Sequence, residues 1–262
     1  MDDATKREVR GRRPGLMPVL LVSLLLGCSA INIEARAIER STAETRSSAP
    51  GTPIRLWGTI FYIHHAKAAT GPNAVPLRNR AGHTLGVALS VRDWCLGARE
   101  GTVAIRRPNG TRTFNHAGFG ARRNTNCAAV LPGVRANELA MIEHTSFMPL
   151  SARAPFGLSS DPRFRLVPYR TVATDTDKIP LGSVLYIPAL RGRAIHGGVH
   201  DGYVFAADTG VGVGGNHIDF FTGTSHTNPA PGLFAGTSSV TFTAYRIRDP
   251  IMIKKLRQLH WR

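Results

Sequence analysis

The chain has 262 residues, enough to bury a full core in one or two domains. Its 33 lysines and arginines against 17 aspartates and glutamates give a net charge of +16, which favours anionic partners. The basic residues are scattered and are not gathered with aromatic residues in a recognisable module, so we do not expect nucleic-acid binding. The 27 glycines and 17 prolines favour many turns and short strands over long helices.

The N-terminus has the features of an export signal. A basic opening is followed by the apolar run 16–26, which is too short to span a bilayer. The run ends in Leu-Leu-Gly-Cys-Ser, which resembles the lipobox of bacterial lipoproteins, with Cys28 as the acylated residue. We expect a signal peptide at 1–28 and a cell-envelope location on the periplasmic side, as an outer-membrane lipoprotein. Ordinary cleavage after Ala37, giving a soluble periplasmic protein, is the alternative.

Two further features fit an exported protein. Residues 29–53 are small and polar without an apolar period, which is typical of a flexible linker. If Cys28 carries lipid, Cys95 and Cys127 are left as an even pair in an oxidising compartment. We expect a disulfide between them, and two unpaired buried thiols are the alternative.

The folded part begins with the run 54–63, whose aromatic and β-branched residues predict a strand. Its Trp57 and Tyr62 could stack on a bound ligand, although packing in the core is the more common use of such side chains. Residues 64–150 have the pattern of an inserted α+β region. Within it we predict a short helix capped by Ser90, a hairpin around 108–110 and a loop over 115–126.

Three aspartates then follow at turns and in apolar strands. Asp175 precedes an Ile-Pro-Leu-Gly turn, Asp208 ends an apolar strand, and Asp219 lies between Ile218 and Phe220. A glycine-rich segment separates the last two, and such segments allow a tight left-handed backbone. A carboxyl group in an apolar strand is costly to bury unless it is hydrogen-bonded or is needed as a neutral acid. The two strand acids therefore indicate a functional site.

In this order and spacing, Asp175, Asp208 and Asp219 resemble the three acids of the Asp-Asp-Asp (3D) domain family. The catalytic barrel of membrane-bound lytic transglycosylase A is of this family. The resemblance covers roughly residues 165–222 and implies a mainly β protein, a six-stranded double-psi β-barrel with an inserted α+β region. We expect a first barrel strand at 54–63, the insertion at 64–150, the barrel core at 151–250 and a basic C-terminal tail at 251–262, whose charge favours a solvated end.

The resemblance also implies a chemistry. Such enzymes cleave the β-1,4 bond between N-acetylmuramic acid (MurNAc) and N-acetylglucosamine (GlcNAc) in peptidoglycan and leave a 1,6-anhydro sugar. One carboxyl group acts first as acid and then as base, and it needs a raised pKa. Asp219 matches the catalytic position. Asp208 either assists it or accepts backbone N–H bonds from the turn that begins with Thr209 and Gly210.

Other residues are expected to support this site. Asp175 orders the turn that follows it. His217 either tunes the acid, binds the sugar or points outward from its strand. Asn216 joins Trp57 and Tyr62 as a candidate substrate-binding residue. The family usually has a lysine where this chain has Gly214, so a cation that would bind or orient an anionic sugar is missing or comes from elsewhere.

Two other classes of function stay open. A non-catalytic peptidoglycan-binding or structural envelope protein would keep the barrel and the acids without turnover, and Gly214 favours it. A zinc-dependent cell-wall peptidase would use His196, His200, His217 and His226, but the glycines around the first two argue against a helical ligand pair. We therefore expect no metal and no cofactor. The expected partners are peptidoglycan glycan strands and, through the lipid, a membrane, with the protein as a monomer.

Overall fold

The computed structural model describes residues 51–107, 110–151 and 154–262. The predicted signal peptide, Cys28 and most of the predicted linker 29–53 lie outside the described residues. The first strand, β1, begins at Thr52 and so takes up the last two residues of that linker. Among the described residues, no helix is long and apolar enough to cross a membrane.

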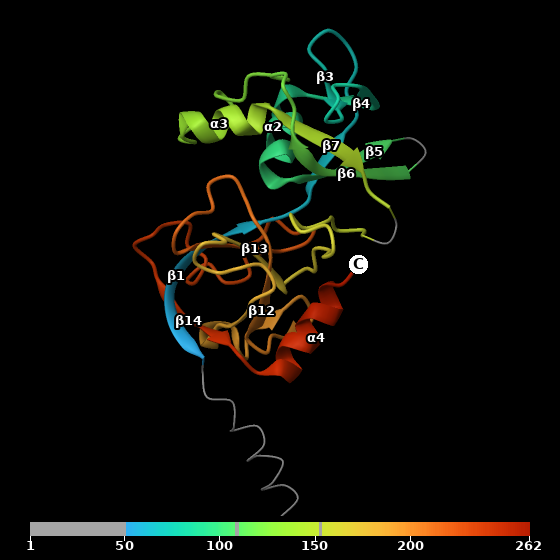
Figure 1. Ribbon diagram of the computed structural model, residues 1–262. Coiled ribbons are helices and arrows are strands. Elements are labelled where there is room, and N and C mark those ends of the chain that lie inside the picture. Colours follow the sequence, from blue (N-terminus) through green and yellow to red (C-terminus); the bar gives the residue numbers. More distant parts are fainter. Residues whose placement is uncertain (1–50, 108–109, 152–153) are drawn as a thin grey trace, which may run out of the picture. The chain divides into compact units, whose positions relative to one another are not determined.

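Six strands form a closed barrel, in the order β1-β13-β8-β12-β9-β14. Figure 1 labels β1, β12, β13 and β14. Two neighbouring pairs, β1 with β13 and β8 with β12, are parallel, and the other pairs are antiparallel. The predicted fold class, a mainly β protein on a six-stranded double-psi barrel with an α+β insertion, is confirmed. The barrel strands are β1 (Thr52–Phe61), β8 (Thr171–Thr174), β9 (Val184–Tyr186), β12 (Tyr203–Asp208), β13 (His217–Phe221) and β14 (Phe242–Ile247).

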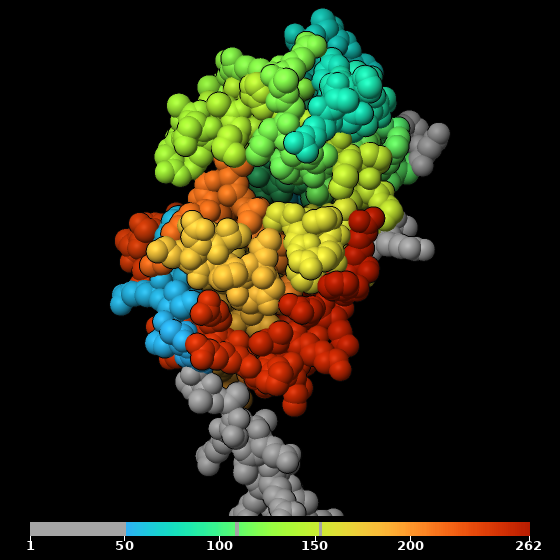
Figure 2. All heavy atoms as spheres, viewed as in Figure 1, coloured from blue at the N-terminus to red at the C-terminus, as the bar shows by residue number. Residues whose placement is uncertain are grey.

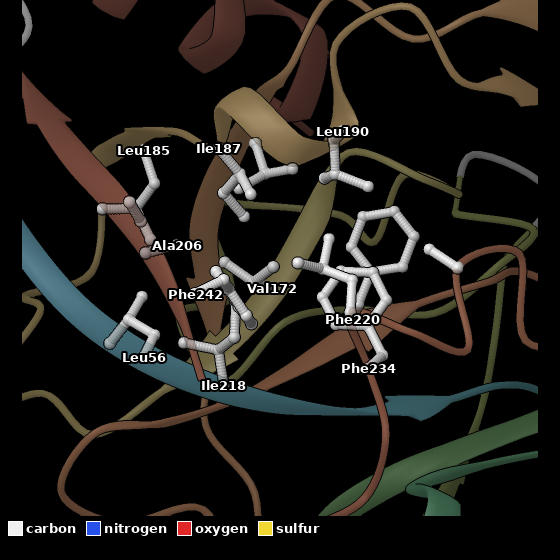
Figure 3. Close-up of a cluster of buried hydrophobic side chains, with 14 of the residues drawn as sticks. Leu56, Val172, Leu185, Ile187, Leu190, Ala206, Ile218, Phe220, Phe234 and Phe242 are labelled. Carbon is white, nitrogen blue, oxygen red and sulfur yellow. The ribbon is translucent and has the colours of Figure 1, made fainter. Parts of the chain in front are cut away.

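The barrel interior is filled by alternate residues of these strands. Ile218 and Phe220 of β13 are fully buried, and they pack with Leu56 of β1 and Val172 of β8 (Figure 3). Because side chains alternate along a strand, His217 and Asp219 lie on the opposite face of β13. The same packing that fills the core thus places both polar residues outside it.

Residues 64–149 form a second sheet of mixed strands with its own core. The sheet order is β2-β5-β6-β7, with β2 at His64–Lys67, β5 at Thr102–Arg107, β6 at Gly110–Phe119 and β7 at Thr145–Pro149. Trp94, Phe114 and Phe147 are fully buried in this core. A disulfide joins Cys95 to Cys127, the pair predicted from the sequence. The region also contains the hairpin strands β3 (Val75–Arg78) and β4 (Thr84–Leu89) and the helices α2 (Val91–Glu100) and α3 (Ala136–Glu143).

In this region the predicted capped helix and hairpin are confirmed, and the predicted loop is partly wrong. Helix α2 is capped by the Ser90 hydroxyl, which accepts from the Asp93 N–H at 3.1 Å, and it ends at Gly101 with φ of 79°. Strands β5 and β6 form the predicted hairpin. The loop predicted at 115–126 is wrong for its first residues, because β6 continues to Phe119 through its pairing with β7.

The predicted solvated tail at 251–262 is instead mostly helix α4 (Pro250–His260), which packs on β12 and β9 (Figure 1). The Asp249 side chain caps its first turn by accepting from the Ile251 N–H at 2.8 Å. His260 is fully buried and its Nε2 lies 3.0 Å from the Thr171 hydroxyl, while Leu256 is nearly fully buried. The basic side chains occupy the outer face, and the C-terminal residues in red form part of the surface in Figure 2.

Candidate active site

Parallel pairing of β1 with β13 brings together residues that are about 160 positions apart in sequence. Trp57 lies beside His217 and Thr59 beside Asp219 in the strand register. The Thr59 hydroxyl is 2.8 Å from Asp219 Oδ1 and also 2.8 Å from His217 Nε2. These four side chains share the strand faces that point away from the barrel core. Asp219 therefore has a polar neighbour that the local sequence does not reveal.

The environment of Asp219 favours its neutral form. Burial raises the pKa of Asp219 to about 6, and the charge of Asp208 acts in the same direction. The positive charge of Arg99 opposes that rise in pKa, and so does the Thr59 hydroxyl when it donates to the ionised carboxylate. The residue as a whole is half-buried. A carboxyl group with such a pKa can give up a proton and take it back near neutral pH.

Asp208 lies at the end of β12 and is held from two sides. Its Oδ1 accepts the Ser160 N–H at 2.8 Å, and the Thr209 N–H also bonds to this carboxyl group. Burial nevertheless raises the pKa of Asp208 to about 6. Asp208 thus accepts the expected N–H of Thr209 and a second N–H from Ser160, which lies in a distant loop. Ser160 had no sequence signal that linked it to this site.

Asp175 connects its own turn to the glycine-rich segment. Its carboxylate accepts the Gly215 N–H at 2.6 Å and the Asp177 N–H at 3.0 Å, and these bonds lower the pKa of Asp175. Gly215 and Gly212 have φ values of 64° and 88°, in the left-handed region that glycine adopts without strain. Asp175 therefore lies where an ionised carboxylate orders the segment that leads into β13.

His217 occupies a defined position between an aromatic ring and two hydrogen-bonding groups. Its ring stacks on Trp57 with centroids 3.8 Å apart and an interplanar angle of 3°. Its Nδ1 lies 3.2 Å from the Gly212 carbonyl oxygen, on the opposite side from Thr59. Burial lowers the pKa of His217, which favours the neutral imidazole at neutral pH. The side chain points away from the barrel core, which is one of the alternatives from the sequence, but it is buried rather than exposed to solvent.

A fourth carboxyl group, Glu100, was missed by the sequence analysis. It ends helix α2, its side chain is only 7% exposed, and its Oε2 accepts the Tyr62 N–H at 3.1 Å. Burial raises the pKa of Glu100 to about 8, and the charge of nearby Asp219 adds to this effect. Glu100 therefore holds its proton at neutral pH beside the candidate acid. A glutamate before a glycine cap is ordinarily a surface residue, so no local signal could have identified it.

The remaining candidate residues lie around this group. Asn216 is exposed, and its backbone carbonyl oxygen accepts the backbone N–H of Trp57 at 3.0 Å. Tyr62 is half-buried, with its ring 5.3 Å from that of His226. Gly214 is exposed, and a Cβ atom at this position would meet nothing within 4 Å. The backbone thus leaves room for a side chain where the family usually has lysine.

The histidines considered as zinc ligands are dispersed. His200 is buried, with Nε2 2.8 Å from the Tyr169 carbonyl oxygen, and His196 stacks on the Tyr169 ring. Both lie around the two-stranded ribbon β10 (Ala194–Ile195) and β11 (Gly198–Val199), which follows the short 3₁₀ helix η1 (Pro188–Leu190). In the part of the chain that the structure describes, no three His, Cys, Asp or Glu side chains are arranged to hold a metal.

Part of the chain matches a known protein family. Residues 170–243 match the 3D domain family, and this match includes Asp175, Asp208 and Asp219. This segment is similar to the 3D domain. It covers strands β8, β9, β12 and β13 of the barrel, whereas β1, which contributes Thr59, lies outside the match.

Several solved structures are similar to the chain at low identity. E. coli MltA with bound chitohexaose is 16% identical over 74% of this chain and 72% of that chain, with a TM-score of 0.48. A membrane-bound lytic murein transglycosylase from Agrobacterium tumefaciens is 15% identical over 79% and 78%, with a TM-score of 0.46. MltA from Neisseria gonorrhoeae is 13% identical over 74% and 72%, with a TM-score of 0.42. No curated protein matches the sequence.

Proposed function

We propose that the protein is a lytic transglycosylase-like enzyme that cleaves the MurNAc–GlcNAc β-1,4 bond of peptidoglycan and forms 1,6-anhydroMurNAc. The observation that carries this proposal is Asp219, an acid of the 3D domain whose pKa is raised to about 6 in a half-buried position. One carboxyl group that changes its protonation state near neutral pH is what this reaction needs.

The reaction uses Asp219 twice. Its carboxylic acid gives a proton to the glycosidic oxygen as the bond from C1 of MurNAc to that oxygen breaks, and GlcNAc leaves with a free 4-hydroxyl. The resulting carboxylate takes the proton of the MurNAc 6-hydroxyl, whose oxygen closes on C1. No water enters, and Asp219 ends the cycle protonated. This differs from the two-carboxylate scheme of most glycosidases.

Neighbouring residues would support this cycle without exchanging protons with the sugar. Asp208 adds a negative charge that raises the pKa of Asp219. Asp175 orders the glycine-rich segment through Gly215. Trp57, Tyr62 and Asn216 would contact the glycan, with Trp57 and Asn216 fixed beside each other. Thr209 and Gly210 complete the turn after Asp208.

The proposed location of the protein is the cell envelope. The disulfide between Cys95 and Cys127 fits a protein exported to an oxidising compartment. Lipid on Cys28 would tether the chain to a membrane, with peptidoglycan strands as the partner of the folded part. Mass spectrometry of the mature N-terminus tests this, because a diacylated Cys28 and an unmodified cleaved end differ in mass.

Digestion of purified sacculi with the mature protein and with Asp219→Asn tests the activity, with mass spectrometry of the released muropeptides. We expect anhydro-ended products from the wild type alone. Reducing-end sugars would show a hydrolase, and cleaved stem peptides would show a peptidase, and either result contradicts the proposal.

A non-catalytic peptidoglycan-binding protein is the second candidate, favoured by the glycine at position 214. It predicts that both proteins co-sediment with sacculi and that neither releases muropeptides.

A further inference from the structure

Four groups form an unbroken line of hydrogen-bond contacts behind the candidate acid. Asp219 Oδ1 contacts the Thr59 hydroxyl at 2.8 Å, this hydroxyl contacts His217 Nε2 at 2.8 Å, and His217 Nδ1 contacts the Gly212 carbonyl oxygen at 3.2 Å. The Thr59 hydroxyl has one hydrogen for two of these contacts. The protonation states of Asp219 and His217 are therefore linked.

Counting hydrogens fixes the arrangement. A carbonyl oxygen only accepts, so the bond to Gly212 requires a hydrogen on His217 Nδ1. A neutral imidazole then has a bare Nε2, which accepts the hydrogen of the Thr59 hydroxyl. Thr59 donates to Asp219 when the carboxyl group is ionised, so with its hydrogen on His217 the remaining contact is satisfied only if a neutral Asp219 donates to the Thr59 oxygen. All three hydrogen bonds are thus made when Asp219 is a neutral acid and His217 is neutral.

Removing the proton from Asp219 disturbs this arrangement. Thr59 then donates to the carboxylate, and its oxygen lone pairs face the bare His217 Nε2 at 2.8 Å. The contact is restored if His217 becomes imidazolium, or if its hydrogen moves from Nδ1 to Nε2 and the bond to Gly212 is lost. Burial lowers the pKa of His217 and so opposes the imidazolium.

We propose that Asp219, Thr59 and His217 form a proton-coupled network in which Thr59 and His217 are positioning residues that favour return of the proton to Asp219. The network itself stands on the contacts alone, whereas its use in the cycle rests on the proposed function. It supplies what a single-carboxyl mechanism needs, because the carboxylate left after the acid step is made a better base for the 6-hydroxyl proton.

Other charged groups act on the network from three elements. Glu100 and Arg99 of α2 and Asp208 of β12 lie near Asp219. Glu138 of α3 lies near His217, and its charge raises the pKa of this histidine against the larger effect of burial. The groups of α2 and β12 thus affect the pKa of Asp219, and Glu138 affects that of His217. The hydrogen-bond contact between Asp219 and His217 runs through Thr59.

Nitrogen NMR of protein with ¹⁵N-labelled histidine tests the network without any turnover. Nδ1 and Nε2 have different shifts in the two tautomers, and His217→Gln identifies the His217 signals among the ten histidines. We expect the Nδ1–H form below a pH of about 6, and a change at Nε2 as Asp219 ionises. In Asp219→Asn the amide donates permanently to Thr59, so the Nδ1–H form should persist at higher pH.

Thr59→Val should uncouple the histidine from the acid, and Thr59→Ser should keep the coupling and control for folding. An unchanged histidine response in Thr59→Val, or no response in the wild type, would overturn the network. Sacculus digestion on the same proteins separates the two proposals. Coupling without anhydro products refutes the proposed function alone, and anhydro products without coupling refute the network alone.

Discussion

Asp175 and Asp219 both lie in the segment that matches the 3D domain family, but the first lies in a turn and the second in the parallel pair β1–β13. Two backbone N–H groups bond to Asp175 and lower its pKa. Asp219 has one hydroxyl neighbour in place of backbone donors, and burial raises its pKa to about 6. The same side chain is thus kept charged where it orders a loop, and its pKa is raised toward neutral pH where it can act as an acid.

Replacing each aspartate by asparagine should separate these two roles. Asp219→Asn cannot donate and recover a proton, so we expect muropeptide release to fall by about 10²- to 10⁴-fold. Asp175→Asn keeps the acid and weakens only the bonds to Gly215 and Asp177, so its loss should be much smaller. Release assayed at matched protein concentration, with circular dichroism as a folding control, checks this. Equal losses would mean that both residues serve only the fold.

Glu100 extends the comparison to a carboxyl group with a still higher pKa. Because its pKa is about 8 in the folded protein and 4.5 in a model peptide, the folded state binds more protons between these values. The free energy of unfolding should therefore fall as pH rises from about 4.5 to about 8. Glu100→Gln keeps an acceptor for the Tyr62 N–H and removes this dependence.

Urea unfolding of the wild type and of Glu100→Gln at both ends of this range measures the effect. The advantage of the variant should grow with pH to the order of a few kcal/mol. A constant difference between the two proteins would show that Glu100 is charged in the folded state. Asp93→Asn, which alters a half-buried acid of the same helix, is a matched control.

His217→Phe removes the ring nitrogen that contacts the Thr59 hydroxyl, the neighbour of Asp219. Phenylalanine retains stacking on Trp57 but offers no acceptor, so the Thr59 hydroxyl is free to bond to the Asp219 carboxylate. This stabilises the charged form and should lower the pKa of Asp219 by about one unit.

The wild type needs protonated Asp219, so its release rate should fall as pH rises through about 6. In His217→Phe this fall should begin about one unit lower, with about tenfold less activity at neutral pH. The pH profile of muropeptide release measures the shift. A lower rate with an unchanged profile would assign His217 to structure only.

The sequence could predict the parts of this site whose residues lie close together along the chain. The spacing of Asp175, Asp208 and Asp219 identified the three acids, because each follows or occupies a short pattern of turn and strand residues. The capped helix α2 followed from Ser90 and Gly101 for the same reason.

Contacts that depend on barrel closure could not be predicted in this way. Thr59 reaches Asp219 only because β1 pairs with β13, and Glu100 is buried only because its helix ends at Tyr62. Nothing within either short segment encodes the partner. Helix α4 was not predicted for a different reason. Asp249 followed by Pro250 is a local signal for the start of a helix, but the tail was assigned from its basic composition instead.

Gly214→Lys restores the family's usual residue and should give the smallest change in stability. The position is exposed, a Cβ atom would meet nothing within 4 Å, and its φ lies outside the left-handed region. The free energy of unfolding should therefore change by no more than about 0.5 kcal/mol. The added cation should strengthen co-sedimentation with anionic sacculi at low salt, and the gain should disappear at high salt because ions screen it.

Gly215→Lys is the matched control for this substitution. Its surroundings are equally open, but its φ of 64° strains any residue with a Cβ atom. It also donates its N–H to Asp175, so a distortion there would disturb the glycine-rich segment. It should bring the same charge with a loss of stability that Gly214→Lys avoids. If Gly214→Lys binds sacculi no better than the wild type at low salt, the missing cation at this position does not limit glycan binding.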